Sequence, residues 1–117
     1  MFESLNKKFS NPFDITIVDG EFYKLSQLEL DKVYEVVSMY INPRGKHGEY
    51  ACLGIYIDLG VYGWVIVPNH LIEAVKTILD NPEYIKAVNE KHLGITVRKY
   101  HSKKYDKDCY TVDFKDI

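Results

Sequence analysis

Three consecutive stretches of the chain alternate between aliphatic side chains and polar or aromatic ones. They are residues 32–42, 49–59 and 61–68, and the short segments between them are rich in Gly and Pro. A period of two places successive side chains on opposite faces of a β-strand, and Gly and Pro favour turns between strands. The pattern therefore predicts three antiparallel strands in series, joined by hairpin loops.

The two faces of these predicted strands carry different side chains. One face is aliphatic and holds Val33, Val37, Met39, Ile41, Ala51, Leu53, Ile55, Ile57, Leu59, Val65 and Val67. The other is rich in rings and holds Tyr34, Tyr40, Tyr50, Tyr56, Tyr62 and Trp64. We expect the aliphatic face to form the core and most rings to lie outside it, with Tyr34 and Tyr110 as core or strand-pairing residues.

A helical period replaces the alternation after Pro68. Apolar residues recur on one helical face at Leu71, Ile72, Val75, Ile78 and Leu79, which predicts a helix with Asn69 as its N-cap. Asn81-Pro82 then predicts the start of a second helix over residues 83–92, ended by Gly94.

Two more strands are predicted at the end of the chain, over residues 95–101 and 109–114, with a charged turn between them. At the other end, residues 1–12 read as a polar arm, and Asp19-Gly20 between two β-prone runs predicts a hairpin.

The predicted class is mainly β with one or two helices, in one domain over residues 1–117. The order strand–strand–strand–helix–strand–strand is that of the OB-fold, a five-stranded, partly open Greek-key barrel, here with an extra N-terminal hairpin. An ordinary antiparallel α+β sheet is the competing interpretation.

The sequence offers no catalytic or cofactor motif. The four histidines are far apart and form no HxH or HExxH motif, and Cys52 and Cys109 have no CxxC spacing. We therefore expect no enzyme activity, no metal, no cofactor and two reduced thiols. No stretch reaches the length of a membrane span and the N-terminus lacks an apolar signal core, so we expect a cytoplasmic protein without membrane contact.

The aromatic residues and the basic loops together suggest a binding surface. The net charge is −2, so nucleic acid could bind only through a local basic patch. Bases stack on exposed rings while cations contact phosphates, and the candidate stacking residues are Trp64, Tyr40, Tyr56, Tyr62 and Tyr100. The candidate phosphate contacts, in the first hairpin loop and the late basic turn, are Arg44, Lys46, Arg98, Lys103 and Lys104.

Two other functions use the same residues. Exposed Tyr, Trp and Arg are also the usual anchors of protein interfaces, so a module that binds another protein is the main alternative. An RNA-binding module is a third, because stacking does not distinguish the sugar. Open sheet edges also favour self-association.

The layout resembles the small OB-fold single-stranded DNA-binding proteins of lactococcal and related phages. The likeness lies in KLSQLELDKVYEVV, GEYACLGIYIDLG, YGWVIVP with its following helix, and the late basic hairpin. The resemblance implies sequence-independent binding of single-stranded DNA during phage replication or recombination in the cytoplasm of an infected bacterium. It also implies a homo-oligomer and a replication or recombination protein as partner. Cellular relatives end in a Gly-rich tail with an acidic-aromatic tip, whereas this sequence ends in VDFKDI.

Overall fold

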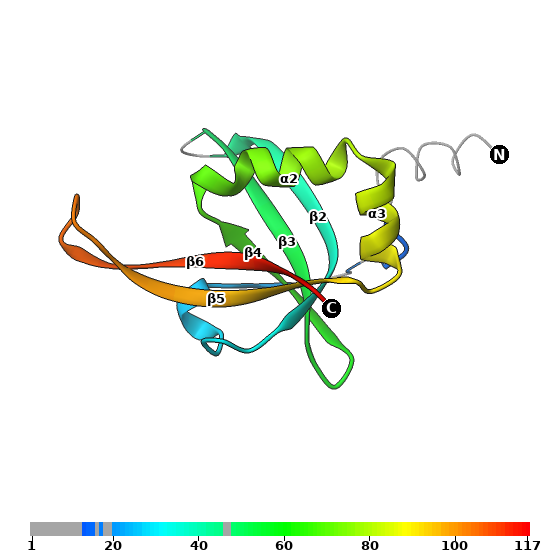
Figure 1. Ribbon diagram of the computed structural model, residues 1–117, viewed down its shortest axis with the longest axis horizontal. Helices are drawn as coiled ribbons and strands as arrows, with labels where there is room; N and C mark the ends of the chain where they lie inside the picture. Colours follow the sequence, from blue (N-terminus) through cyan, green and yellow to red (C-terminus); the bar gives the residue numbers. More distant parts are fainter. Residues whose placement is uncertain (1–12, 16, 18–19, 46–47) are drawn as a thin grey trace.

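A computed structural model describes residues 13–15, 17, 20–45 and 48–117, apart from the side chains of residues 44 and 45. Within these residues the protein is mainly β, with one curled six-stranded sheet that forms a half-barrel and two α-helices (Figure 1). The strands are β1 (Glu21–Tyr23), β2 (Tyr34–Gly45), β3 (Gly48–Asp58), β4 (Val61–Val67), β5 (Leu93–Ser102) and β6 (Lys107–Asp116).

The sheet has the order β1-β4-β3-β2-β5-β6. The pairs β2–β3, β3–β4, β2–β5 and β5–β6 are antiparallel, whereas β1 pairs with β4 in parallel. Strands β2 and β5 are joined through the residue pairs Tyr34↔Ile95 and Glu35↔Gly94. The short 3-10 helix η1 (Leu25–Gln27) contacts both β4 and β6, and it therefore lies at the seam between the two ends of the curled sheet.

The predicted N-terminal hairpin lies partly outside the described residues, because Asp19 is not among them. The described part of this region forms β1, which adds to the edge of β4 with Phe22 opposite Trp64. The predicted arm over residues 1–12 also lies outside the described residues.

A β-bulge in β2 changes which residues form the core. The register with β3 shifts between Val36 and Ser38, and a bulge reverses the faces on either side of it. Tyr34 and Val36 before the shift and Met39 after it therefore all belong to the buried core. The prediction that Val33 points inward is wrong, since its side chain is 48% exposed.

The turn between β3 and β4 also departs from simple alternation. Leu59, predicted to be in the core, is 93% exposed. The strand ends at Asp58, and Leu59 and Gly60 form the turn with φ of 45° and 79°. The Gly60 N–H donates to the Tyr56 hydroxyl at 3.1 Å, which fixes this turn.

The helical segment consists of η2 (Asn69–Leu71), α2 (Ile72–Leu79) and α3 (Pro82–Asn89). Helix α2 lies across one end of the curled sheet, and α3 runs in a different direction from α2 and contacts β2 (Figure 1). Val75 and Val88 are the helical residues buried most deeply in the core.

The predicted start of the second helix is confirmed, but the two predicted caps, Asn69 and Gly94, are wrong. Asn81 caps α3 by accepting from the Glu83 N–H at 2.9 Å, with Pro82 at the first helical position. Asn69 lies within η2, and Leu71 stands at the N-cap of α2 without a side-chain cap bond. Helix α3 ends at Asn89, so Gly94 belongs to β5 instead of a helix cap.

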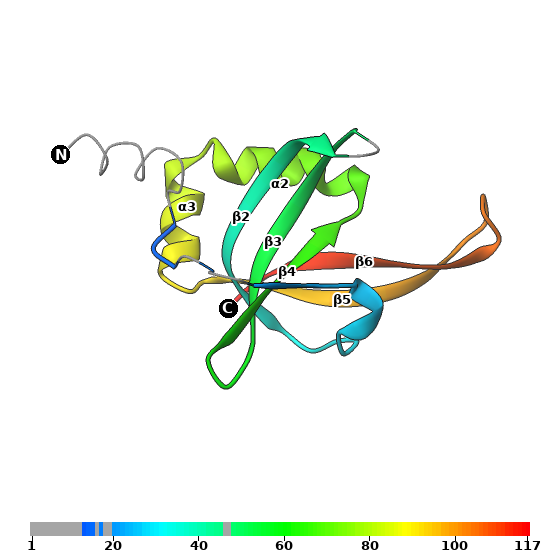
Figure 2. The same ribbon diagram turned by 180° about the vertical axis from the view of Figure 1, so that it is seen from behind.

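The last two strands form a long hairpin that projects from the half-barrel (Figures 1 and 2). They pair without interruption from Leu93↔Asp116 to Ser102↔Lys107, and both are longer than the predicted ranges 95–101 and 109–114. The projection gives the molecule a long dimension of 54 Å against 32 and 27 Å. None of the described helices has the length and apolar character that a membrane crossing requires.

Candidate functional site

The rings of Tyr40 and Trp64 meet on the outer face of the half-barrel. Their centroids are 4.9 Å apart and their planes are inclined by 79°, an edge-to-face contact between β2 and β4. A methyl group on Gly54, in the intervening strand β3, would lie 3.1 Å from Trp64 Cζ3. Both rings are half-buried, and the missing side chain at Gly54 leaves room for the tryptophan ring.

Ile17 lies close to Gly54 and Gly20, on the same face of the sheet as Trp64. A methyl group on Gly54 would also lie 2.6 Å from Ile17 Cδ1, and one on Gly20 would meet Ile17 Cγ2 and lie 3.1 Å from Trp64 Cδ1. The side of Trp64 nearest Gly54 is therefore in contact with the protein itself. Alternation alone could not reveal this cover, because it arises from a residue outside the strands.

A second ring pair lies toward the β3–β4 turn. Tyr56 and Tyr62 are opposite each other across the two strands, with ring centroids 5.4 Å apart and planes at 72°. Both side chains are half-buried, and Tyr56 also accepts the Gly60 hydrogen bond. All four stacking candidates of β2–β4 thus lie on the outer face, as expected, and each contacts another ring.

Two apolar side chains of this face are more exposed than the rings. Phe22 is 56% exposed and Ile66 is 48% exposed. Phe22 is the direct partner of Trp64 in the β1–β4 ladder, so the two side chains lie on the same face. Sequence reasoning did not propose Phe22, because a three-residue strand shows too little alternation to assign its partner or its face.

Two groups beside the ring cluster, the Tyr40 hydroxyl and the Cys52 thiol, carry no charge. Burial raises the pKa of the Tyr40 hydroxyl far above its ordinary value, and the nearby Cys52 thiol raises it further. Burial likewise raises the pKa of the Cys52 thiol, which is fully buried. Both groups stay protonated at physiological pH, and both described cysteines are free thiols.

Charged side chains below the tip of the β5–β6 hairpin form ion pairs between its two strands. Arg98 Nε donates to Asp113 Oδ2 at 3.0 Å, and Lys99 Nζ lies 3.2 Å from Asp108 Oδ2. Hydrogen bonds from Arg98 and Lys99 lower the pKa values of Asp113 and Asp108, respectively. Arg98, predicted as a phosphate contact, therefore already holds a carboxylate. Asp113 lies on the facing strand β6, outside the basic turn to which the sequence assigned Arg98.

The tip of the hairpin differs from its base. Tyr105 is 63% exposed, with Lys104 Nζ 5.3 Å and Lys107 Nζ 5.7 Å from its ring centroid. Within the described part of the chain, Lys103, Lys104 and Lys107 form no ion pair. Sequence reasoning identified Lys103 and Lys104 but missed Tyr105, although its position between lysines in the turn was a usable signal.

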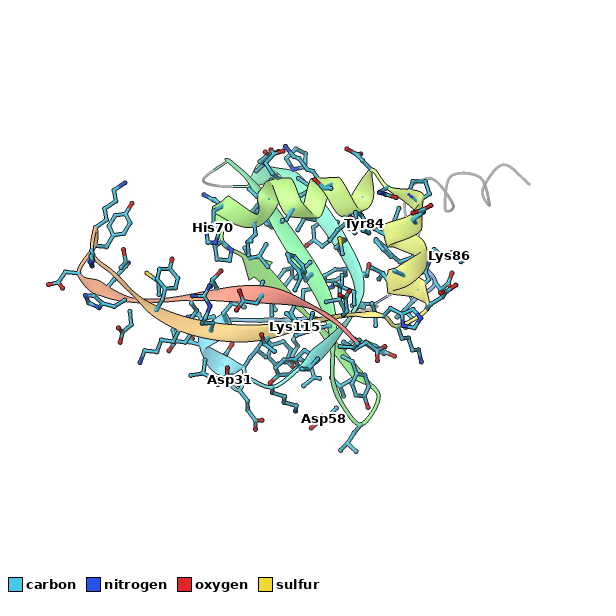
Figure 3. The ribbon with its side chains drawn as sticks, viewed as in Figure 1. Asp31, Asp58, His70, Tyr84, Lys86 and Lys115 are labelled. Atoms are coloured by element: carbon cyan, nitrogen blue, oxygen red, sulfur yellow. The ribbon has the colours of Figure 1, made fainter. Side chains whose placement is uncertain are left out.

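The remaining candidates are separated from these groups. Tyr100 is 37% exposed on β5 and belongs to the hairpin, not to the ring pairs of β2–β4. The Arg44 side chain and Lys46 lie outside the described residues. His70 lies beside β6 (Figure 3), with its Nε2 3.3 Å from Thr111 Oγ1. Among the described residues, no group of three or more His, Cys, Asp or Glu side chains is arranged to hold a metal ion.

The site is thus an outer face with paired rings and exposed Phe22, next to a projecting hairpin with an aromatic, lysine-rich tip. Comparison of the chain with protein-family models, with curated proteins and with solved structures finds no match.

Proposed function

We propose that this protein binds single-stranded DNA without sequence preference, through its outer aromatic face and the lysines of the β5–β6 hairpin. It would act in phage replication or recombination, in the cytoplasm of an infected bacterium. The proposal includes a homo-oligomer and a replication or recombination protein as partner.

The strand pairing supports an OB-like barrel as the framework of this function. Strands β2, β3 and β4 form a meander, two helices follow, and β5 returns to pair with β2 before β6. In an OB-fold the ligand lies on the barrel face between the loop after the first barrel strand and the loop between the last two. Here those loops are the β2–β3 loop and the hairpin tip.

The single observation that carries the proposal is the hairpin tip. An exposed ring with two ammonium groups 5.3 and 5.7 Å from its centroid, next in sequence to Lys103, combines the two kinds of contact that a single strand needs. The ring of Tyr105 can stack on a base while Lys103, Lys104 and Lys107 contact phosphates, because none of the three has a carboxylate partner in the described structure. Each stacked base contributes about 1–3 kcal/mol.

Oligo-dT titrated at two salt concentrations tests the proposal, with fluorescence of the single tryptophan as the signal. We expect quenching of Trp64 and an affinity that falls as salt rises, because binding releases counterions. Lys103→Ala with Lys104→Ala should reduce the slope of log K against log salt by about 1.4, at about 0.7 for each single-strand contact.

The matched control removes two lysines elsewhere, Lys86→Ala with Lys115→Ala. These lie on α3 and β6, away from the hairpin tip (Figure 3), and the salt slope should stay unchanged. No quenching and no gel shift at low salt would exclude the proposal. Competition by oligo-U against oligo-dT distinguishes an RNA-binding module, and light scattering gives the oligomeric state.

One feature favours the alternative, a phage module that binds a host protein. A cavity of about 350 Å³ lies between the helices and the ends of β5 and β6, lined in part by Ile78, Tyr84, Leu93 and Phe114. Tyr84 at its rim is 49% exposed, and an exposed tyrosine beside an apolar pocket is typical of protein interfaces. A host protein captured in equimolar amount, and not displaced by oligo-dT, would favour this function.

A further inference from the structure

The seam between the two ends of the sheet contains a groove that adjoins the outer face and shares Phe22 and Ile66 with it. It has a volume of about 450 Å³ and is bounded by β1, η1, Ile66 of β4 and Tyr110 of β6. This volume is within the range of pockets that hold small ligands. We call it the seam groove, and we propose that it holds one unpaired base of a bound single strand, with the adjoining phosphate at Lys24. This inference rests on the proposed function.

The walls of the seam groove have the chemistry that a base requires. Phe22 forms one side and Tyr110 another, on strands from opposite ends of the sheet. Phe22 is 56% exposed, so its ring is available for stacking. Apolar walls with a few polar groups are typical of sites that bind flat organic ligands, and every base presents a flat face to an aromatic ring.

Lys24 and Ser26 supply the polar groups of the seam groove. Both are exposed and both line it. The Lys24 backbone N–H donates to Gln27 Oε1 at 2.7 Å, which holds the start of η1. The Lys24 ammonium group forms no ion pair among the described residues. No acidic side chain lines the groove, so its charge suits a phosphate, and Ser26 can donate to a base edge.

The groove also connects the two parts of the proposed site. Phe22 shares the outer face with Trp64, its partner in the β1–β4 ladder. On the other side, Tyr110 lies directly opposite Lys99 in the hairpin, so both are on one hairpin face. A strand that leaves the outer face at Phe22 and continues to the lysines of the hairpin passes over the seam groove. Charge, apolar walls and continuity therefore favour a base over an apolar peptide side chain.

The test uses photocrosslinking and three groove variants of the full chain. An oligo-dT that carries 5-iodouracil should form adducts at Phe22 or Tyr110, mapped by mass spectrometry. Ser26→Phe should fill the groove and weaken binding about tenfold, the effect of one lost stacking contact. Lys24→Ala should reduce the salt slope by about 0.7, and Lys24→Arg should restore it.

The matched control is Tyr84→Ala, an exposed tyrosine on α3 that does not line the seam groove, and it should bind oligo-dT like the wild type. If the wild type binds and quenches Trp64 but Ser26→Phe and Lys24→Ala bind equally well, the seam groove is not the base site and the proposed function stands. If the wild type binds no oligonucleotide, both proposals fail. Adducts confined to the hairpin tip would also overturn the groove assignment.

Discussion

Tyr40 and Trp64 contact each other edge-to-face across the strand that separates them, with ring centroids 4.9 Å apart. The contact is possible because the intervening strand has Gly54 beneath Trp64. Ring pairs of this kind stabilise the sheet, and they also set which ring faces remain available to a ligand. Stability and binding therefore depend on the same position.

Replacement of Gly54 by alanine should displace Trp64. The added methyl group would lie 2.6 Å from Ile17 Cδ1 and 3.1 Å from Trp64 Cζ3, and overpacking of this kind costs about 1–3 kcal/mol. We expect a lower urea midpoint and altered Trp64 emission. Gly48→Ala is the control, since nothing lies within 4 Å of its added methyl although its φ is +102°. It should leave the emission unchanged, and equal emission changes in both variants would contradict the prediction.

The two asparagines that precede the helices should differ in their effect on stability. Asn81 accepts from the Glu83 N–H at 2.9 Å, and loss of such a cap costs about 1 kcal/mol. Asn81→Ala should therefore lower the free energy of unfolding by this amount. Asn69→Ala should change it by less than half as much, because Asn69 provides no side-chain cap for η2 or α2. Chemical denaturation of the two variants side by side checks the difference.

The two thiols should react at different rates in the native protein. Cys52 is fully buried and burial raises its pKa, so both access and thiolate formation are suppressed. Cys109 is half-buried. A thiol-specific chromogenic reagent should label one thiol quickly, and the second only in denaturant. If both thiols react quickly in the wild type, or if the remaining thiol of Cys109→Ser reacts quickly, the prediction is contradicted. Either result would show that the region around Cys52 opens readily in the native protein.

Release of Arg98 from its partner should strengthen DNA binding. Asp113 holds the guanidinium at 3.0 Å, so Asp113→Asn leaves Arg98 free for a phosphate and should increase the salt slope by about 0.7. Asp80→Asn, at the C-cap of α2, makes the same charge change elsewhere. A similar gain in both variants would attribute the effect to net charge alone.

The hairpin carboxylates should make stability depend on acid pH. Hydrogen bonds from Lys99 and Arg98 lower the pKa values of Asp108 and Asp113. A carboxyl with a lowered folded-state pKa stabilises the fold above its unfolded pKa of about 3.9, and this contribution is lost as the pH falls through the folded pKa. Urea midpoints of the wild type and Asp108→Asn/Asp113→Asn should differ at pH 6 and converge below about pH 4. A constant difference across this range would contradict the linkage.

Alternation predicted the strands well wherever it runs without interruption. Ala51, Leu53 and Ile55 of β3 and Val65 and Val67 of β4 are in the core as expected. The failures occur where the backbone leaves the ladder. The bulge at Val36–Ser38 exposes Val33, and the turn with positive φ exposes Leu59. A period of two cannot reveal either feature, because both change the phase of the alternation locally.

The candidate site was predictable in its residue types but not in their contacts. The outer position of Tyr40, Tyr56, Tyr62 and Trp64 follows from strand parity. Phe22 lies beside Trp64 because β1 pairs in parallel with β4, a strand far away in the sequence. Ile17, just before β1, is brought close to Gly54 in the same way. The pairing of Arg98 with Asp113 depends on hairpin register, which the sequence leaves open across a charged turn.

The two parts of the sheet are joined at the seam by few backbone hydrogen bonds. The ribbon of β1–β4 and the ribbon of β5–β6 share backbone pairing at Tyr34↔Ile95 and Glu35↔Gly94. The segment before β2 adds one bridge, Leu30↔Val97, with a hydrogen bond from the Asp31 N–H to the Val97 carbonyl at 3.3 Å, and contacts around η1 also join the two ribbons. Relative movement of the two ribbons therefore meets little resistance from hydrogen bonds. A ligand that contacts both ribbons across the seam would restrict this movement, so the bound protein would be more rigid than the free protein.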